Sequence, residues 1–165
     1  MKSPKFILIR KKLLNQKTVA NIINNRKEIK TPDYHLTFRA NHKTLQIHDF
    51  ISNGRLTREK AIDIRNKLIK HAKENNLDLI ATYSWIFYEY PKYAEIFGFK
   101  LVKGSSREYD ILKKLNNVKR VIGADINNYK LYVQDKEGNI RSIKFRKKHS
   151  LPRYEIDLTG KIKYE

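Results

Sequence analysis

Hydrophobic and polar residues alternate over two consecutive stretches of the chain, residues 34–40 and residues 44–52. Such alternation is typical of β-strands with one buried face. Asn41 and His42 separate the two stretches, and asparagine is common in turns. We therefore predict an antiparallel pair of strands. Strict alternation places Asp49 on the side of the hydrophobic residues of its strand, which is unusual for a carboxylate.

After residue 57 the spacing of the apolar residues changes from that of a strand to that of a helix. Residues 58–75 place apolar side chains on one stripe, and Thr57 precedes them in the position of an N-terminal cap. An apolar run at 77–82 predicts a buried strand, and a short aromatic-rich helix that ends at Gly98 follows it. Another short strand is expected at 99–102. A strand, a helix and a strand in this order suggest a crossover connection.

Shorter elements are predicted on both sides of this central region. They are a strand at 5–10, a helix that begins at Thr18 and includes Ile29, a helix at 109–115, a hairpin with strands at 129–133 and 140–145, and a last edge strand at 154–158. The pattern predicts an α/β (α+β) protein with a mixed, largely antiparallel sheet flanked by helices and a C-terminal β-hairpin extension. We place the α/β core at 1–103 and the extension, a basic helix plus the hairpin, at 104–165, packed on the core as one domain.

Positive charge is concentrated at the two ends of the chain. The sequence has 36 Lys and Arg against 17 Asp and Glu, a formal net charge of +19. Cations placed on phosphates release condensed counterions, so the charge predicts nucleic acid or a nucleoprotein complex as the partner. A general enrichment of surface lysine is the alternative explanation. The predicted nucleic-acid contacts are Lys11, Lys12, Arg146, Lys147 and Lys148.

Several classes of site are missing from the sequence. The chain has no cysteine, which excludes disulfides, cysteine nucleophiles and thiolate metal sites. Its five histidines do not have the spacing of a zinc site, so no metal is predicted. The apolar runs are far shorter than the ~20 residues needed to span a bilayer, so we expect a soluble cytoplasmic protein without a membrane partner.

The central region resembles the GCN5-related N-acetyltransferase (GNAT) superfamily. The similarity covers roughly a third of the chain and rests on the order of elements, on AKENN at 72–76 followed by LDLIAT at 77–82, and on YAEIFGFK at 93–100. The last segment is similar to the family's tyrosine-rich helix that ends in Gly-Phe. The resemblance implies a GNAT-like sheet, acetyl-CoA as the cofactor and N-acyl transfer as the reaction.

The chain departs from the family at the loop that holds the phosphates of the cofactor. The family pattern of Gln or Arg, two residues, Gly, one residue, and Gly or Ala falls on Leu56, Glu59 and Ala61, of which only Ala61 fits. Glycines there let backbone N–H groups approach a pyrophosphate at a helix N-terminus, and a glutamate would repel it. Arg55 and Arg58 are close enough in sequence to compensate. The cofactor-binding candidates are therefore Arg55, Arg58 and Ala61.

Acyl transfer to an amine needs a base for the amine and an acid for the leaving group. In the family a tyrosine four residues before the glycine is often the acid, and that position is Ala94 here, next to Tyr93. Ser84 is a further candidate because it lies at a strand end, where open α/β sheets bind ligands. The other candidates are His48 and Asp49 as bases and Tyr83, Tyr88 and Tyr93 as acids.

A weaker similarity connects LIATYS at 79–84 and KHSLPRYEIDL at 148–158 with the phage Mom-type DNA-modification proteins. Those proteins resemble an acetyltransferase fold adapted to adenine in DNA. The Asp expected after the Tyr-Ser strand end is absent, and Trp85 stands near its place.

Three functions agree with these observations. The first is a divergent acetyltransferase-like protein, an acyl-transfer or base-modifying enzyme of a phage or mobile element, that acts on nucleic acid or on a protein bound to it. The second is a non-catalytic basic protein that kept the scaffold, lost the cofactor loop and binds nucleic acid or inhibits a host nucleoprotein complex. The third is a protein that binds an acidic protein surface. Aromatic and basic residues interleave on the late hairpin as in single-strand binders, although any half-exposed hairpin shows the same pattern: Tyr129, Lys130, Tyr132 and Lys144.

Overall fold

The computed structural model describes residues 27–146 and 150–160, and the structural statements below refer to these residues. The predicted strand at 5–10 and the beginning of the predicted helix at Thr18 lie outside the described residues. The same holds for four of the predicted nucleic-acid contacts: Lys11, Lys12, Lys147 and Lys148.

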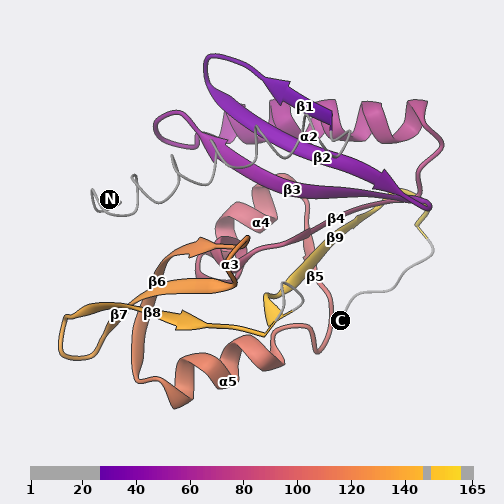
Figure 1. The fold of residues 1–165 in the computed structure, drawn as a ribbon. Helices are drawn as coiled ribbons and strands as arrows, with labels where there is room; N and C mark the ends of the chain where they lie inside the picture. Colours follow the sequence, from indigo (N-terminus) through magenta and orange to yellow (C-terminus); the bar gives the residue numbers. More distant parts are fainter. Residues whose placement is uncertain (1–26, 147–149, 161–165) are drawn as a thin grey trace.

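A six-stranded sheet forms the centre of the molecule, with the strand order β1-β2-β3-β4-β9-β5 (Figure 1). Its strands are β1 (Lys27–Lys30), β2 (Tyr34–Asn41), β3 (Thr44–Ser52), β4 (Leu79–Tyr83), β5 (Lys100–Leu101) and β9 (Arg153–Asp157). A second sheet of three antiparallel strands consists of β6 (Val118–Asp125), β7 (Lys130–Asp135) and β8 (Ile140–Lys144). The helices are α2 (Arg58–Glu74), α3 (Trp85–Glu89), α4 (Pro91–Phe97) and α5 (Arg107–Leu115). The predicted fold class, a mixed and largely antiparallel sheet flanked by helices, is confirmed.

Helix α2 packs on one face of the large sheet. It begins where predicted, because the Thr57 hydroxyl accepts a hydrogen bond from the backbone N–H of Lys60 at 3.2 Å. One stripe of the helix is fully buried: Ala61, Ile64, Leu68 and Ala72. This stripe covers the apolar residues of β2 and β3 and forms the main core with them. The sequence pattern predicted this helix and its buried stripe correctly.

A β-bulge in β3 corrects the predicted position of Asp49. Ile47 is opposite Phe38 and Asp49 is opposite Thr37, so His48 is an extra residue in the strand. Because the side chains of Thr37 and Phe38 point to opposite faces of β2, Asp49 and Ile47 also point to opposite faces. The carboxylate therefore lies on the face away from α2, and the prediction from strict alternation was wrong.

The parallel strands β3 and β4 pair over a short distance only. Their register runs from Thr44 opposite Leu79 to Gln46 opposite Ala81. Beyond this point β3 pairs only with β2, and β4 pairs only with β9. The two strands thus separate toward their carboxyl ends.

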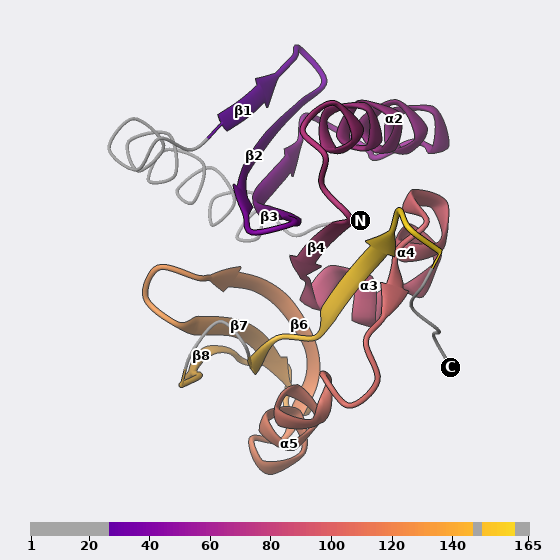
Figure 2. The ribbon, with the colours of Figure 1, turned by 90° about the vertical axis from the view of Figure 1, so that its right-hand side faces the viewer.

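Three predictions about secondary structure were incomplete or wrong. The last strand, β9, lies between β4 and β5 instead of at an edge of the sheet (Figure 2). Ile29 belongs to strand β1 instead of a helix, because its segment pairs with β2 and its side chain packs against the main core. Strand β6 was not predicted. It pairs with β7 and helps to form a second core, into which α3 inserts Trp85 and α5 inserts Tyr109.

Candidate active site

A cleft of about 670 Å³ lies between the amino end of α2 and the residues around the junction of α3 and α4. We call it the amino-end cleft. One wall consists of Arg55, Leu56, Thr57 and Arg58, and the other wall consists of Glu89, Tyr90, Pro91, Lys92, Tyr93 and Ile96.

The topology of the sheet explains why the cleft forms at this place. Strand β3 leads into the loop before α2, and strand β4 leads into α3 and α4. Because β3 and β4 are parallel, the residues that follow them emerge at the same edge of the sheet. The separation of the two strands leaves room between these connections.

The loop before α2 is held by its backbone conformation at Gly54 and by hydrogen bonds from the side chain of Lys60. Gly54 has φ +85°, a conformation that side-chain-bearing residues rarely adopt. The Lys60 ammonium group donates hydrogen bonds to the backbone carbonyls of Asn53 at 3.2 Å and Arg55 at 3.1 Å. These bonds bring the loop back against the first turn of the helix and set the position of Arg55.

The first wall of the cleft is suited to an anion. The first four N–H groups of a helix have no partner inside the helix, and the helix dipole is positive at this end. Here the Thr57 hydroxyl accepts from the N–H of Lys60, and the N–H groups of Arg58 and Glu59 make no hydrogen bond to another described residue. No ion pair within the described part of the chain involves Arg55, Arg58 or Lys92.

The second wall is largely aromatic and apolar. Pro91 opens α4, and the rings of Tyr90 and Tyr93 lie 6.1 Å apart. Glu89 brings a carboxylate to this wall. It accepts hydrogen bonds from the Tyr109 hydroxyl and from the Lys113 ammonium group, each at 2.6 Å. Both donors come from α5, so the second core holds Glu89 in place.

The predicted cofactor-binding residues fall into two groups. Arg55 and Arg58 line the amino-end cleft. Ala61 is fully buried in the main core, and its N–H donates to the carbonyl of Thr57 at 3.0 Å, so this amide is committed to the helix. Glu59, the residue that departs from the family pattern, is exposed and does not line the cleft.

Among the candidate acids, Tyr93 is the residue that lines the cleft. Its hydroxyl makes no hydrogen bond to another described residue. Ala94, where the family resemblance places a tyrosine, is buried in the main core. Tyr88 points elsewhere, because its hydroxyl donates to the Asp110 carboxylate at 2.8 Å and its ring packs against Tyr109.

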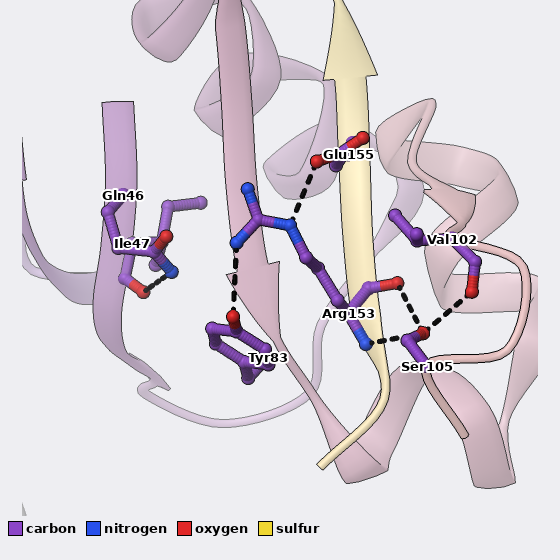
Figure 3. Close-up of polar contacts among 7 residues, drawn as sticks. All are labelled: Gln46, Ile47, Tyr83, Val102, Ser105, Arg153 and Glu155. Atoms are coloured by element: carbon purple, nitrogen blue, oxygen red, sulfur yellow. Dashed lines mark hydrogen bonds and ion pairs between the residues drawn. The ribbon is translucent and has the colours of Figure 1, made fainter. Parts of the chain in front are cut away.

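Tyr83 lies at the end of β4 and contacts Arg153 of β9 (Figure 3), and Ser84 follows it directly before α3. The Tyr83 hydroxyl accepts a hydrogen bond from the Arg153 guanidinium at 3.2 Å, and Arg153 also donates to Glu155 at 2.8 Å. The Ser84 hydroxyl accepts from the N–H of Phe87 at 3.0 Å and caps α3. Ser84 thus has a structural role in this chain.

The candidate bases lie on β3. His48 is buried at the bulge, and Asp49 is half-buried on the sheet face that is turned away from α2. Neither residue lines the amino-end cleft. Arg153 and Glu155 extend the same polar face across β9, since they lie opposite Tyr83 and Ala81 of β4.

Sequence reasoning missed several of these residues. Tyr90, Pro91 and Lys92 form much of the second wall, and the proline that opens α4 was the available signal for them. Nothing local in the sequence marked Arg153 or Glu155, because their neighbours in β4 are about seventy positions away. Arg146, the remaining predicted nucleic-acid contact, is exposed just after β8.

Two further searches concern the described residues only. No group of three or more His, Cys, Asp or Glu side chains lies close enough together to hold a metal ion. No described helix is long and apolar enough to cross a membrane.

Comparison with known proteins identifies the fold. The chain is similar to the crystal structure of a Bacillus subtilis acetyltransferase in complex with CoA, with a TM-score of 0.52, 10% sequence identity, and coverage of 96% of this chain and 94% of that chain. At this identity the likeness shows a GNAT-like fold, as the sequence resemblance implied. No protein-family model and no curated protein sequence matches the chain. The similarity to Mom-type proteins stays a prediction.

Proposed function

We propose that this protein is an N-acyltransferase that binds acetyl-CoA in the amino-end cleft and passes the acyl group to an amine. The observation that carries the proposal is the composition of the cleft. A helix amino end with Arg55 and Arg58 faces an aromatic wall that carries Lys92, and none of these three cations pairs with a described carboxylate. Such a site fits a ligand with a pyrophosphate at one end and a largely apolar arm. The GNAT-like fold, shared with an acetyltransferase solved with CoA, supports it.

The residues of the cleft have separate roles in this proposal. Arg55, Arg58 and Lys92 bind the phosphates, and the N–H group of Arg58 adds a donor at the positive end of the helix dipole. When bound, acetyl-CoA supplies a thioester whose acyl group can be transferred. As the C–N bond forms and the C–S bond of the thioester breaks, the Tyr93 hydroxyl would donate a proton to the thiolate that leaves, and His48 or Asp49 on β3 would accept the proton that the amine loses.

Calorimetric titration of the full chain with coenzyme A and acetyl-CoA tests the proposal. We expect binding of both ligands, and binding that weakens as salt is raised, because charged contacts to phosphates are screened. Acetylation of an amine in the presence of the protein, followed by thiol release, would extend the result from binding to turnover. Absence of heat at high protein concentration would exclude the acyltransferase proposal.

The acceptor is the second part of the proposal. The net charge of +19 supports nucleic acid, or a protein bound to it, as the partner that carries the amine. This part does not depend on the cleft, and a transferase that acetylates only small amines would contradict it.

Two observations favour a second candidate function, a basic binding protein without catalysis. Glu59 lies in the first turn of α2, where a carboxylate opposes the approach of a phosphate, and Ala94 occupies the position at which the family has its tyrosine. Salt-dependent binding to DNA or RNA combined with no affinity for coenzyme A would favour this function over the transferase.

A further inference from the structure

The three-stranded sheet has one buried face and one open face. Along β7, Leu131 and Val133 are buried, and the residues between them are not. Leu131 and Val133 lie opposite Ile143 and Arg141 of β8 on the buried face, so the alternate residues share the open face. These are Lys130, Tyr132 and Gln134 of β7 and Ile140, Ser142 and Lys144 of β8. Arg120 of β6 joins this face opposite Gln134. We call the following seven residues the outer face: Arg120, Lys130, Tyr132, Gln134, Ile140, Ser142 and Lys144.

The charges of the outer face are not balanced. Lys130 lies directly opposite Lys144, and like charges in this position destabilise a sheet. In the described part of the chain, neither lysine forms an ion pair, and Arg120 donates only to the neutral side chain of Gln134, at 2.9 Å. A sheet that keeps such a pair is suited to an anion that lies across both strands.

The acidic residues of this sheet do not neutralise the outer face. Asp125 lies opposite Lys130, but it is buried, and its carboxylate accepts hydrogen bonds from the backbone and side chain of Asn128. Asp135 lies at the other end of β7 and accepts from the N–H groups of the hairpin turn. Both carboxylates are therefore committed to turns of the sheet.

The outer face also carries an aromatic ring between its cations. Tyr132 lies opposite Ser142, a small residue, and is half-buried, with its side chain packed partly against the second core. Residues two positions apart on a strand are separated by about 6.6 Å, which places the Tyr132 ring between Lys130 and Gln134. Tyr129 is 41% exposed, but its ring packs against the buried Phe145 of the second core, so it does not belong to the outer face. Cations that bind a phosphate backbone and rings on which bases stack are the two components of single-strand binding sites.

We propose that the outer face binds single-stranded nucleic acid, with the Lys130–Lys144 pair and Arg120 on the phosphates and Tyr132 stacked on a base. A duplex does not fit equally well, because its bases present no free face to a tyrosine ring. The proposal specifies which surface binds the nucleic-acid partner and that the partner is single-stranded. It uses none of the residues of the amino-end cleft, so either site can fail without the other.

Fluorescence anisotropy of a labelled oligothymidylate with the full chain tests the proposal, measured between about 50 and 200 mM salt. The informative variant is K130E/K144E. It is compared with K70E/K73E on the exposed surface of α2, which changes the net charge by the same amount. We expect K130E/K144E to lower affinity at least ten-fold and to reduce the salt slope, and K70E/K73E to have a much smaller effect.

A second pair of variants tests the stacking contact. Tyr132→Leu is expected to weaken binding about five-fold or more, and Tyr132→Phe to restore it, because the ring is what stacks on a base. Thermal melting of both variants shows whether the sheet still folds. Coenzyme A titration of the same proteins shows whether the amino-end cleft is intact.

Four outcomes would overturn the proposal. They are no binding of the oligothymidylate by the parent protein, equal losses in K130E/K144E and K70E/K73E, tighter binding of a duplex than of the single strand, and displacement of the oligothymidylate by an acidic peptide at lower concentration than by unlabelled strand. The last result would assign the outer face to an acidic protein.

Discussion

Helix α2 has a cleft near each end, and the two clefts differ in how their charges are neutralised. The amino-end cleft has a volume of about 670 Å³, and the second cleft, here the carboxyl-end cleft, has a volume of about 470 Å³. The carboxyl-end cleft is lined by Lys27, Glu28, Ile29, Phe38, Lys67, Lys70, His71 and Glu74. Both contain three Lys or Arg side chains, so the number of basic residues alone does not separate them.

The difference lies in the neighbours of the cations. In the carboxyl-end cleft, Lys67 is 3.1 Å from the Asp63 carboxylate and Lys70 is 3.9 Å from that of Glu74. The helix dipole is negative at this end. In the amino-end cleft the dipole is positive, and no described carboxylate pairs with Arg55, Arg58 or Lys92. A count of basic residues therefore does not identify an anion site, whereas the net local charge and the direction of the helix do.

The strongest test of this comparison removes the cations of each cleft in turn. We expect R55A/R58A to weaken coenzyme A binding about 100-fold, because two charge-assisted hydrogen bonds contribute ~1.5 kcal/mol or more each. The matched variant K67A/K70A, which removes two cations from the carboxyl-end cleft, should leave the dissociation constant within about two-fold. Calorimetry measures both. Equal losses of coenzyme A affinity in the two variants would mean that the cations of both clefts contribute equally to binding.

The next test concerns the acid in the amino-end cleft. Tyr93→Phe keeps the ring and removes the hydroxyl, so we expect acyl transfer to slow by about 100-fold while coenzyme A binding changes little. Tyr88→Phe is the control, because the hydroxyl of Tyr88 is bonded to Asp110 and not placed in the cleft. Thiol release during acetyl transfer measures the rate. A full rate in Tyr93→Phe would remove this residue from the mechanism.

A smaller effect is expected from the caps at the two ends of α2. Thr57→Ala removes the hydroxyl that accepts from the N–H of Lys60 and should lower the free energy of unfolding by about 1 kcal/mol. Coenzyme A binding should weaken with it, since Thr57 also lines the amino-end cleft. At the other end, the Asn75 side chain donates a hydrogen bond to the carbonyl of His71 at 2.8 Å, so Asn75→Ala should lower stability without changing coenzyme A affinity. Urea unfolding and calorimetry separate the two effects, and a change of coenzyme A affinity in Asn75→Ala would contradict the comparison.

The smallest expected effect is a pH dependence from the carboxyl-end cleft. Burial and the Lys27 cation lower the pKa of His71 below its usual value, and Glu74 opposes them in part. Lys67, Lys70 and Glu28 are the other charged groups that line this cleft. Because the folded state disfavours the charged imidazole, the unfolded chain binds more protons below pH ~6.5. The free energy of unfolding should therefore be independent of His71 above that pH and should decrease as the pH falls below it.

Replacement of His71 tests this dependence. Unfolding of the parent protein and of His71→Gln by urea at pH about 7.5 and 5.5 should show a smaller loss of stability in the variant. His42→Asn, in an exposed turn where φ is +56°, is the control, since asparagine tolerates that conformation. Identical losses in the parent and His71→Gln would show that another group carries the pH dependence.

The elements that local pattern specifies strongly could be predicted from the sequence. Thr57 caps α2, the apolar stripe from Ala61 to Ala72 is buried, and Gly98 ends α4 with φ +82°. In each case the residue type meets a requirement of hydrogen bonding, burial or backbone conformation that arises within a few positions of it in the sequence. Strand β6 was missed because its exposed residues Lys119 and Arg120 gave no alternating pattern. Its pairing with β7 decides its conformation.

The candidate site was only partly predictable for a similar reason. Arg55 and Arg58 were expected near the phosphates, and they line the cleft. Ala61 followed from the family pattern, yet its side chain and its N–H are both used by the helix. The second wall, from Glu89 to Ile96, depends on how α4 packs beside the amino end of α2. The distance between these two helices cannot be inferred from the spacing of residues in the sequence.

The sequence by itself determined the period of each strong element, the net charge and the GNAT-like order of strand, helix and strand, because these depend on neighbouring residues and on composition. The tertiary structure decided the rest. The bulge at His48 moved Asp49 to the other face of the sheet, and β9 was placed inside the sheet. Lys130 and Lys144 of the outer face lie opposite each other. Two of the cations of the carboxyl-end cleft pair with carboxylates, and those of the amino-end cleft do not pair with a described carboxylate. These outcomes depend on which distant segments pair, and pairing is decided by burial of the whole core and not by local pattern.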